Sequence, residues 1–204
     1  MKLSLLSMFL FACVMVTGAS ATTITFNFSS TPGNTTMASY TVDGVKITAT
    51  SGTTADLFFK SGGGDETGLG LTPSSENEIG AGQSITFDLS SLFSKNVTSL
   101  SLALGSIQTG ESGQACDAFS HCVSFSPSQS GTLVDITSLF DQMKSEKSGT
   151  LIITAPSGNV LIDELQATTS VPEPSSLLLL GTGILIMAGA VFVMRKQLSG
   201  ATVA

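Results

Sequence analysis

The stretch Tyr40-Thr41-Val42-Asp43-Gly44-Val45-Lys46-Ile47-Thr48 holds two short β-branched runs on either side of an Asp-Gly pair. Asp-Gly suits the left-handed central positions of a two-residue hairpin turn, and the flanking runs alternate in polarity. The stretch therefore predicts two antiparallel strands joined by a tight turn.

Short runs of residues typical of β-strands recur along the rest of the chain. Further strands are predicted at Thr23–Phe28, Leu57–Lys60, Ser84–Leu89, Val97–Leu104, Val123–Phe125, Thr132–Ile136, Thr150–Thr154 and Val160–Thr168. Clusters of Gly, Ser and Pro separate them, and one helix is predicted at Ser138–Lys147. Many short strands with such punctuation indicate a mainly β fold, an antiparallel β-sandwich with a jelly-roll-like topology.

The N-terminal segment has the pattern of a cleaved secretory signal. Met1-Lys2 gives a positive start, an apolar stretch follows, and Ala19-Ser20-Ala21 is a small-x-small cleavage site. Residues 1–21 are therefore expected to direct export, which leaves 22–170 as the exported domain.

The C-terminal segment has the pattern of a membrane helix. Residues 175–194 carry no charge, and a helix of that length spans roughly 30 Å, the thickness of the hydrocarbon core of a bilayer. Pro172 and Pro174 precede it, and Arg195-Lys196 follow as a basic stop, so residues 195–204 are expected on the cytoplasmic side.

This tail resembles the PEP-CTERM sorting tail of exported Gram-negative proteins, on the strength of Val171-Pro172-Glu173-Pro174, the Leu-rich helix and the basic pair. The resemblance implies a precursor anchored in the inner membrane, recognition by an exosortase, and delivery to the cell surface or extracellular matrix. It also implies an association with exopolysaccharide and biofilm. Residues 171–174 are the expected sorting motif.

A second resemblance lies in the domain. Ser39–Val45, Gly68–Gly70, Glu76–Ile79 and Val160–Leu165 are similar to the jelly-roll ectodomains that accompany this tail. This resemblance implies architecture and location. Relatives often read Glu-Ile-Asp where this chain has Glu78-Ile79-Gly80.

The exported portion is acidic. From Thr22 to Ser170 there are 14 Asp and Glu against five Lys and no Arg. Phosphate contacts need clustered cations, so nucleic acid is not expected as a partner.

Two cysteines remain after removal of the signal. Cys116 and Cys122 form an even pair in an exported domain, which predicts a disulfide that contributes roughly 2 kcal/mol by closing a short loop. A Cys–His nucleophile that uses His121 is disfavoured because an oxidised cysteine cannot attack. His121 is interpreted as a plain surface residue.

A calcium site is a further hypothesis. The acidic, Gly-rich connection between Asp65 and Glu78 is interpreted as a long loop, and calcium takes six to eight oxygen ligands. The candidate ligands are Asp65, Glu66, Glu76, Asn77 and Glu78, and a solvated acidic loop is the alternative.

One pattern occurs twice. Asp88–Phe93 and Asp135–Phe140 share the order Asp-aliphatic-hydroxyl-Ser-Leu-Phe. Bulky apolar residues usually face the core, so both segments are interpreted as apolar plugs that close equivalent ends of the sandwich, with an Asp or hydroxyl available to cap a short helical turn. A duplicated binding motif is the alternative.

The residue types and motifs that the sequence lacks argue against several classes of function. The chain has one histidine and lacks Gly-x-Ser-x-Gly and His-Glu-x-x-His, so catalysis, including a hydrolase activity, is not expected. Sugar rings usually stack on Trp or Tyr side chains, and the chain has no Trp and one Tyr. Ice binding needs regularly spaced threonines, and the Thr pairs follow no fixed repeat. A structural or matrix role is favoured, with a calcium-dependent or polysaccharide-binding module as the alternative.

Overall fold

The computed structural model describes residues 21–29, 36, 39–63, 66–170, 181, 183–189 and 191. Residues 1–20 of the signal expected at 1–21, the sorting motif at 171–174 and the stop at 195–196 lie outside these residues, while Ala21 is the first residue of β1. Within the described residues, no helix has the length and apolarity needed to cross a membrane. Most of the span expected at 175–194 lies outside them.

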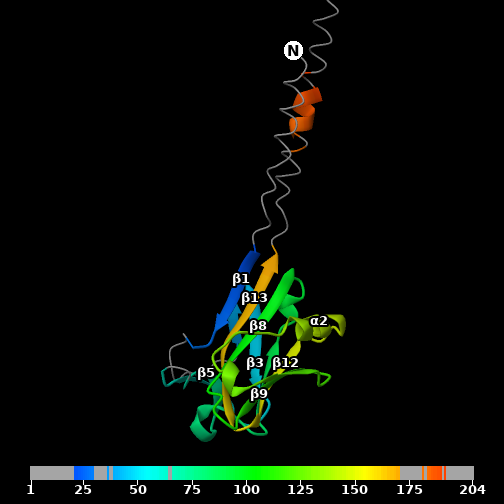
Figure 1. Ribbon diagram of the computed structural model, residues 1–204. Helices are drawn as coiled ribbons and strands as arrows, with labels where there is room; N and C mark the ends of the chain where they lie inside the picture. Colours follow the sequence, from blue (N-terminus) through cyan, green and yellow to red (C-terminus); the bar gives the residue numbers. More distant parts are fainter. Residues whose placement is uncertain are drawn as a thin grey trace, which may run out of the picture. The chain divides into compact units, whose positions relative to one another are not determined.

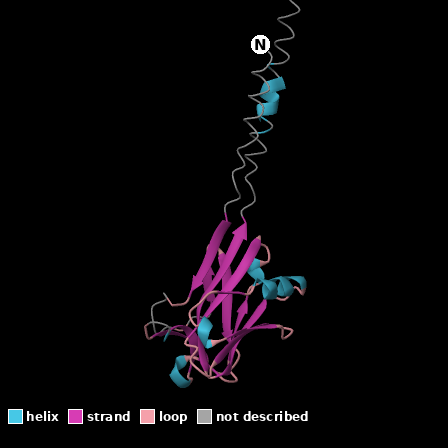
Figure 2. Cartoon of the chain, viewed as in Figure 1, coloured by secondary structure: helices cyan, strands magenta, loops and turns pink. Residues whose placement is uncertain are grey.

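Ala21–Ser170 forms one compact unit built from two antiparallel sheets (Figures 1 and 2). The first sheet holds β1 (Ala21–Asn27), β4 (Asp56–Ser61), β5 (Thr67–Thr72), β6 (Ile79–Gly80), β8 (Val97–Gly105), β11 (Val134–Asp135) and β13 (Asn159–Ser170). The second sheet holds β2 (Ser39–Val42), β3 (Val45–Ser51), β7 (Ser84–Asp88), β9 (Ser112–Asp117), β10 (Cys122–Phe125) and β12 (Thr150–Ser157). Four short elements connect them: η2 (Ser75–Asn77), η3 (Ser90–Leu92), η4 (Pro127–Gln129) and α2 (Thr137–Ser145).

The chain passes repeatedly from one sheet to the other. The first sheet runs in the order β5-β13-β8-β11 and the second in the order β7-β12-β9-β10, each with additional strands at its margin. When these eight strands are numbered 1 to 8 in chain order, the first sheet has the order 1-8-3-6 and the second sheet has the order 2-7-4-5. This interleaving is the order of a jelly roll, so the prediction of an antiparallel β-sandwich with jelly-roll-like topology is confirmed.

Alternation along the strands fills one core between the sheets. In β1 the side chains of Ile24 and Phe26 are buried, while the alternating Thr25 and Asn27 are half-buried. The core residues lie between Ile24 and Ala167 and form one continuous cluster. Ala21–Ser170 therefore carries its own hydrophobic core, and this segment is expected to fold alone.

The predicted hairpin is present. Val42 pairs with Val45 across the turn, and Asp43 and Gly44 take φ values of 49° and 71°. Both angles are positive, as a type I′ turn requires. The predicted helix at Ser138–Lys147 is α2, displaced by one to two residues.

Three strands were absent from the sequence-based prediction, namely β5, the two-residue β6 and β9. The sequence between Asp65 and Glu78 was interpreted as a long loop, but it contains β5, whose Gly68–Leu71 is buried. No strand was predicted between Leu104 and Val123, but β9 occupies Ser112–Asp117 there. One predicted strand is shorter than expected, because only Val134–Asp135 of Thr132–Ile136 pairs in the sheet.

Candidate functional site

A polar cluster lies where β4 and β8 end and where β5 and β6 begin. The Lys60 ammonium donates to Glu66 Oε2 and to Glu78 Oε1. Ser106 Oγ lies 3.0 Å from Glu66 Oε1 and 3.1 Å from Glu78 Oε1, so its hydroxyl hydrogen is shared between the two carboxylates. Glu78 is 1% exposed and Ser106 2% exposed. One cation thus contacts two carboxyl groups, of which Glu78 is buried and Glu66 lies closer to solvent.

The two carboxyl groups respond differently to this setting. Burial raises the pKa of Glu78 in spite of the contact with Lys60. The hydrogen bond from Lys60 lowers the pKa of Glu66, which is more open to solvent. Burial alone would lower the pKa of Lys60, but the hydrogen bonds to both carboxylates outweigh it and raise the pKa.

The candidate calcium ligands are only partly brought together. Glu66 and Glu78 converge, and the Lys60 ammonium already lies between them. Glu76 is exposed and Asn77 half-buried in η2, where both have positive φ, at 63° and 58°. Asp65 lies outside the described residues. Calcium binding here stays a prediction, and it would require Lys60 to be displaced.

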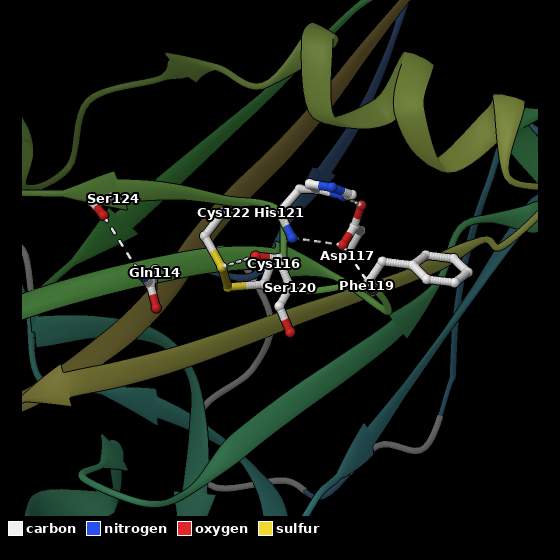
Figure 3. Close-up of a disulfide and its surroundings, with 8 residues drawn as sticks. All are labelled: Gln114, Cys116, Asp117, Phe119, Ser120, His121, Cys122 and Ser124. Carbon is white, nitrogen blue, oxygen red and sulfur yellow. Dashed lines mark hydrogen bonds and ion pairs between the residues drawn. A yellow bond between two sulfur atoms is a disulfide. The ribbon is translucent and has the colours of Figure 1, made fainter.

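The cysteine pair closes a short loop between β9 and β10. Cys116 and Cys122 lie directly opposite each other in the strand pairing, with Cα atoms 4.1 Å apart and sulfurs bonded at 2.02 Å. The predicted disulfide is therefore present. The five residues from Asp117 to His121 form the loop that it closes (Figure 3).

Asp117 and His121 organise this loop from inside. Asp117 is 1% exposed, and its Oδ1 accepts the backbone N–H groups of Phe119 at 2.8 Å and His121 at 2.9 Å. Its Oδ2 lies 2.6 Å from Nδ1 of His121. Figure 3 shows the two side chains facing each other. Burial alone would raise the pKa of Asp117, but the hydrogen bonds from the His121 ring and the two backbone groups outweigh it and lower the pKa.

The interpretation of His121 as a plain surface residue was therefore wrong. Although its side chain is 47% exposed, the ring is held by a buried carboxylate. The available signal was the Asp-x-x-x-His spacing inside a disulfide loop, which places both side chains on one tight turn. Sequence reasoning weighed His121 only against the cysteines.

His121 also joins the loop to α2. Its Nε2 lies 3.0 Å from Nε2 of Gln142, and an amide nitrogen only donates, so the imidazole Nε2 accepts. The ionised Asp117 only accepts, so Nδ1 carries the ring proton. This pattern assigns the Nδ1–H tautomer to His121.

A shallow polar groove of about 480 Å³ runs over the second sheet. The strands β3, β7 and β12 are adjacent there, with Thr50 opposite Thr86 and Asp88 opposite Thr150. Lys147 and Ser148 complete one margin, and hydroxyl groups dominate the lining. The groove was not predicted, because it depends on which β-branched positions face outward on neighbouring strands.

Comparison with known proteins identifies the tail. Residues 170–196 match the PEP-CTERM protein-sorting motif. The match supports export, a membrane-anchored precursor and processing by an exosortase, as expected for a surface-sorted protein. No curated protein and no solved structure matches the chain. The matched segment does not include the β-sandwich.

Proposed function

We propose that this protein is a structural component of the extracellular matrix that is sorted to the surface by an exosortase and contacts exopolysaccharide through the groove on β3, β7 and β12. The observation that carries the proposal is the joint occurrence of a sorting tail and a hydroxyl-lined groove on one sheet of an exported domain. In this proposal the domain acts by binding, without catalysis.

The groove suits a hydroxylated polymer. Thr50, Thr86 and Thr150 offer hydroxyl groups that both donate and accept, as sugar hydroxyls do. Asp88 and Lys147 add one charge of each sign at the margin. The groove's aromatic residue, Phe87, is buried in the core, so ring stacking does not contribute.

Such contacts favour weak binding at each domain. Solvent-accessible hydrogen bonds contribute only about 0.5–1.5 kcal/mol each. A weak site on a surface-sorted protein gains avidity when many copies meet a repeating polymer. This behaviour fits a matrix component better than a soluble receptor.

Binding of the purified 21–170 domain to the producing strain's own exopolysaccharide, measured by cosedimentation, tests the groove. Thr50→Val with Thr86→Val removes two hydroxyl groups while keeping β-branched side chains, and we expect retention to fall severalfold. Thr25→Val, on β1 of the other sheet, is the matched control. Equal retention of all three proteins would reject the groove as the contact surface.

The tail is tested separately in cells. Replacing Pro172-Glu173-Pro174 with alanines should leave export intact and block processing, so the precursor accumulates in the inner membrane. Mass spectrometry of the mature C-terminus reads the cleavage, and protease added to spheroplasts should digest the exported domain. A surface form that still ends in the intact Arg195-Lys196 tail would contradict processing, and full protection from protease would contradict the orientation.

A further inference from the structure

A second polar cluster combines the disulfide loop with the end of α2. Nδ1 of His121 lies 2.6 Å from Asp117 Oδ2 and 3.8 Å from Glu146 Oε1. Asp117, His121 and Glu146 each offer one nitrogen or oxygen ligand atom, and these atoms all lie within 4.8 Å of one another. Glu146 follows α2 directly as its C-terminal cap, so two separate parts of the chain supply the trio.

We propose that Asp117, His121 and Glu146 form a binding site for a divalent first-row transition cation, with zinc as the reference ion. One imidazole and two carboxylates are a donor set that zinc and its neighbours accept, whereas calcium and magnesium prefer oxygen alone. Three protein ligands leave a fourth position of a tetrahedral zinc for water. The half-exposed His121 leaves that side open to solvent.

The charge balance of the cluster supports a cation. Two carboxylates face a single imidazole, and Asp117 is fully buried. Glu146 Oε2 is also buried, and among the described residues it has no hydrogen-bond partner. Buried carboxylate oxygens are normally paired or coordinated, so this atom points to a ligand that completes the cluster.

The two ligand pairs that include His121 need only a small movement. Two ligands that each lie about 2.0–2.1 Å from a tetrahedral zinc are roughly 3.3 Å apart. The Asp117–His121 pair at 2.6 Å would separate by under about 1 Å, and the His121–Glu146 pair at 3.8 Å would close by a similar amount. Rotation of the exposed His121 and the half-buried Glu146 provides both shifts, while Asp117 keeps its backbone hydrogen bonds through Oδ1.

Gln142 is placed to support the metal-bound form. When Nδ1 binds the cation, its proton moves to Nε2, which then donates. Gln142 can turn its amide so that the carbonyl oxygen accepts from Nε2, in place of the present contact at 3.0 Å. A partner on the second ring nitrogen is the usual support of a metal-bound histidine.

The disulfide preorganises the site. Asp117 and His121 lie immediately inside Cys116 and Cys122, so the bond fixes the turn that presents two of the three ligands (Figure 3). Breaking it by Cys116→Ser with Cys122→Ser should weaken binding even where the β-sandwich persists. This gives the short loop a role beyond stability.

Thermal unfolding of the 21–170 domain with zinc chloride, against a metal-free sample, is the first test. At 100 times the dissociation constant, we expect the midpoint to rise by about 5–11 °C. Cobalt substitution should give visible absorption of a low-coordinate site, and nitrogen NMR should show the His121 proton moving from Nδ1 to Nε2. No midpoint shift at millimolar zinc would overturn the proposal.

Two variants locate the site. Glu146→Gln and His121→Gln should each weaken zinc binding at least about tenfold, since outer-shell changes alone cost 10–100-fold. Asp56→Asn, an exposed carboxylate on β4 outside both candidate metal sites, is the control and should bind like the parent. If both site variants bind zinc as tightly as the control, the ion is held elsewhere and the assignment is wrong.

Discussion

The rings of Phe93 and Phe140 pack against each other with centroids 5.6 Å apart and planes inclined by 58°. Each is the last residue of the pattern that occurs twice, Asp88–Phe93 and Asp135–Phe140. Phe140 is fully buried and Phe93 is partly buried against the core. The two segments therefore meet at the core, which confirms that they act as apolar plugs and shows that they close one shared region instead of two separate ends.

The Asp at the start of each copy of the pattern makes the same hydrogen bond. Asp88 Oδ1 accepts the backbone N–H of Ser90 at 2.9 Å, and Asp135 Oδ1 accepts that of Thr137 at 2.8 Å. Each contact lies at the start of a helical element, η3 or α2. The same local sequence thus makes the same turn twice, and each turn directs a Leu and a Phe toward the core.

A double-mutant cycle on the ring pair is the first prediction. Phe140→Ala should cost about 3–5 kcal/mol of unfolding free energy, and Phe93→Ala less, because Phe93 is only partly buried. The coupling between them should be about 0.5–1.5 kcal/mol by urea denaturation. Phe119→Ala, whose side chain is 58% exposed, is the control and should stay within about 0.5 kcal/mol of the parent. Strict additivity would show that the rings do not interact; Phe140→Leu serves if the alanine variant fails to fold.

The second prediction concerns acid stability. The hydrogen bond to Thr137 lowers the pKa of Asp135, as the bond to Ser90 lowers the pKa of Asp88. A folded pKa below the unfolded value of about 3.9 means that the stabilisation is present above that pH and is lost as the pH falls through the folded pKa. Asp135→Asn keeps the capping oxygen but does not titrate. The variant should match the parent near neutral pH and lose less unfolding free energy below about pH 4, measured by urea titration at each pH. A parallel decline of both proteins would contradict the role of the carboxylate.

The sequence predicted strands well where β-branched residues alternate, and poorly where glycine allows close packing. In β5, a Cβ on Gly68 would lie 2.7 Å from the carbonyl oxygen of Ile162, and one on Gly70 would lie 2.2 Å from that of Asn77. In β9, a Cβ on Gly113 would lie 2.5 Å from Leu104 Cδ1. These glycines are there because neighbouring chain segments leave no room for a side chain. The need for glycine at these positions comes from tertiary contacts. A local sequence pattern does not contain those contacts, so it predicts a turn where the glycines lie.

The candidate sites were also predicted only in part, because some of their contacts join residues that are distant in the sequence. The disulfide followed from an even cysteine count in an exported domain. Glu66 and Glu78 were identified as candidate ligands, but Lys60 enters their cluster from β4, and no sequence pattern links it to them. Glu146 joins Asp117 only because α2 ends beside the disulfide loop.

The third prediction is the stability effect of the disulfide. Replacing both Cys116 and Cys122 with serine should lower the unfolding free energy by about 2 kcal/mol, since the closed loop is short. Mass spectrometry of unreduced peptides should find the cross-linked pair in freshly purified exported protein. Two free thiols in that material, or an unchanged denaturation midpoint in the serine variant, would count against it.

The last prediction tests calcium at the Lys60 cluster. Calcium must displace the Lys60 ammonium from Glu66 and Glu78, so Lys60→Met should respond to calcium more strongly than the parent. Without calcium the variant should be less stable by about 3–5 kcal/mol, because removing one partner leaves the buried Glu78 uncompensated. Calcium at 100 times its dissociation constant should restore about 2.7 kcal/mol. Thermal midpoints in calcium and in chelator give the comparison, with the exposed Lys95→Met as control. If Lys60→Met is unfolded in chelator, calcium-induced folding followed by circular dichroism reads the same equilibrium. If millimolar calcium changes the thermal midpoint of neither protein, Glu66 and Glu78 pair with Lys60 and do not bind calcium.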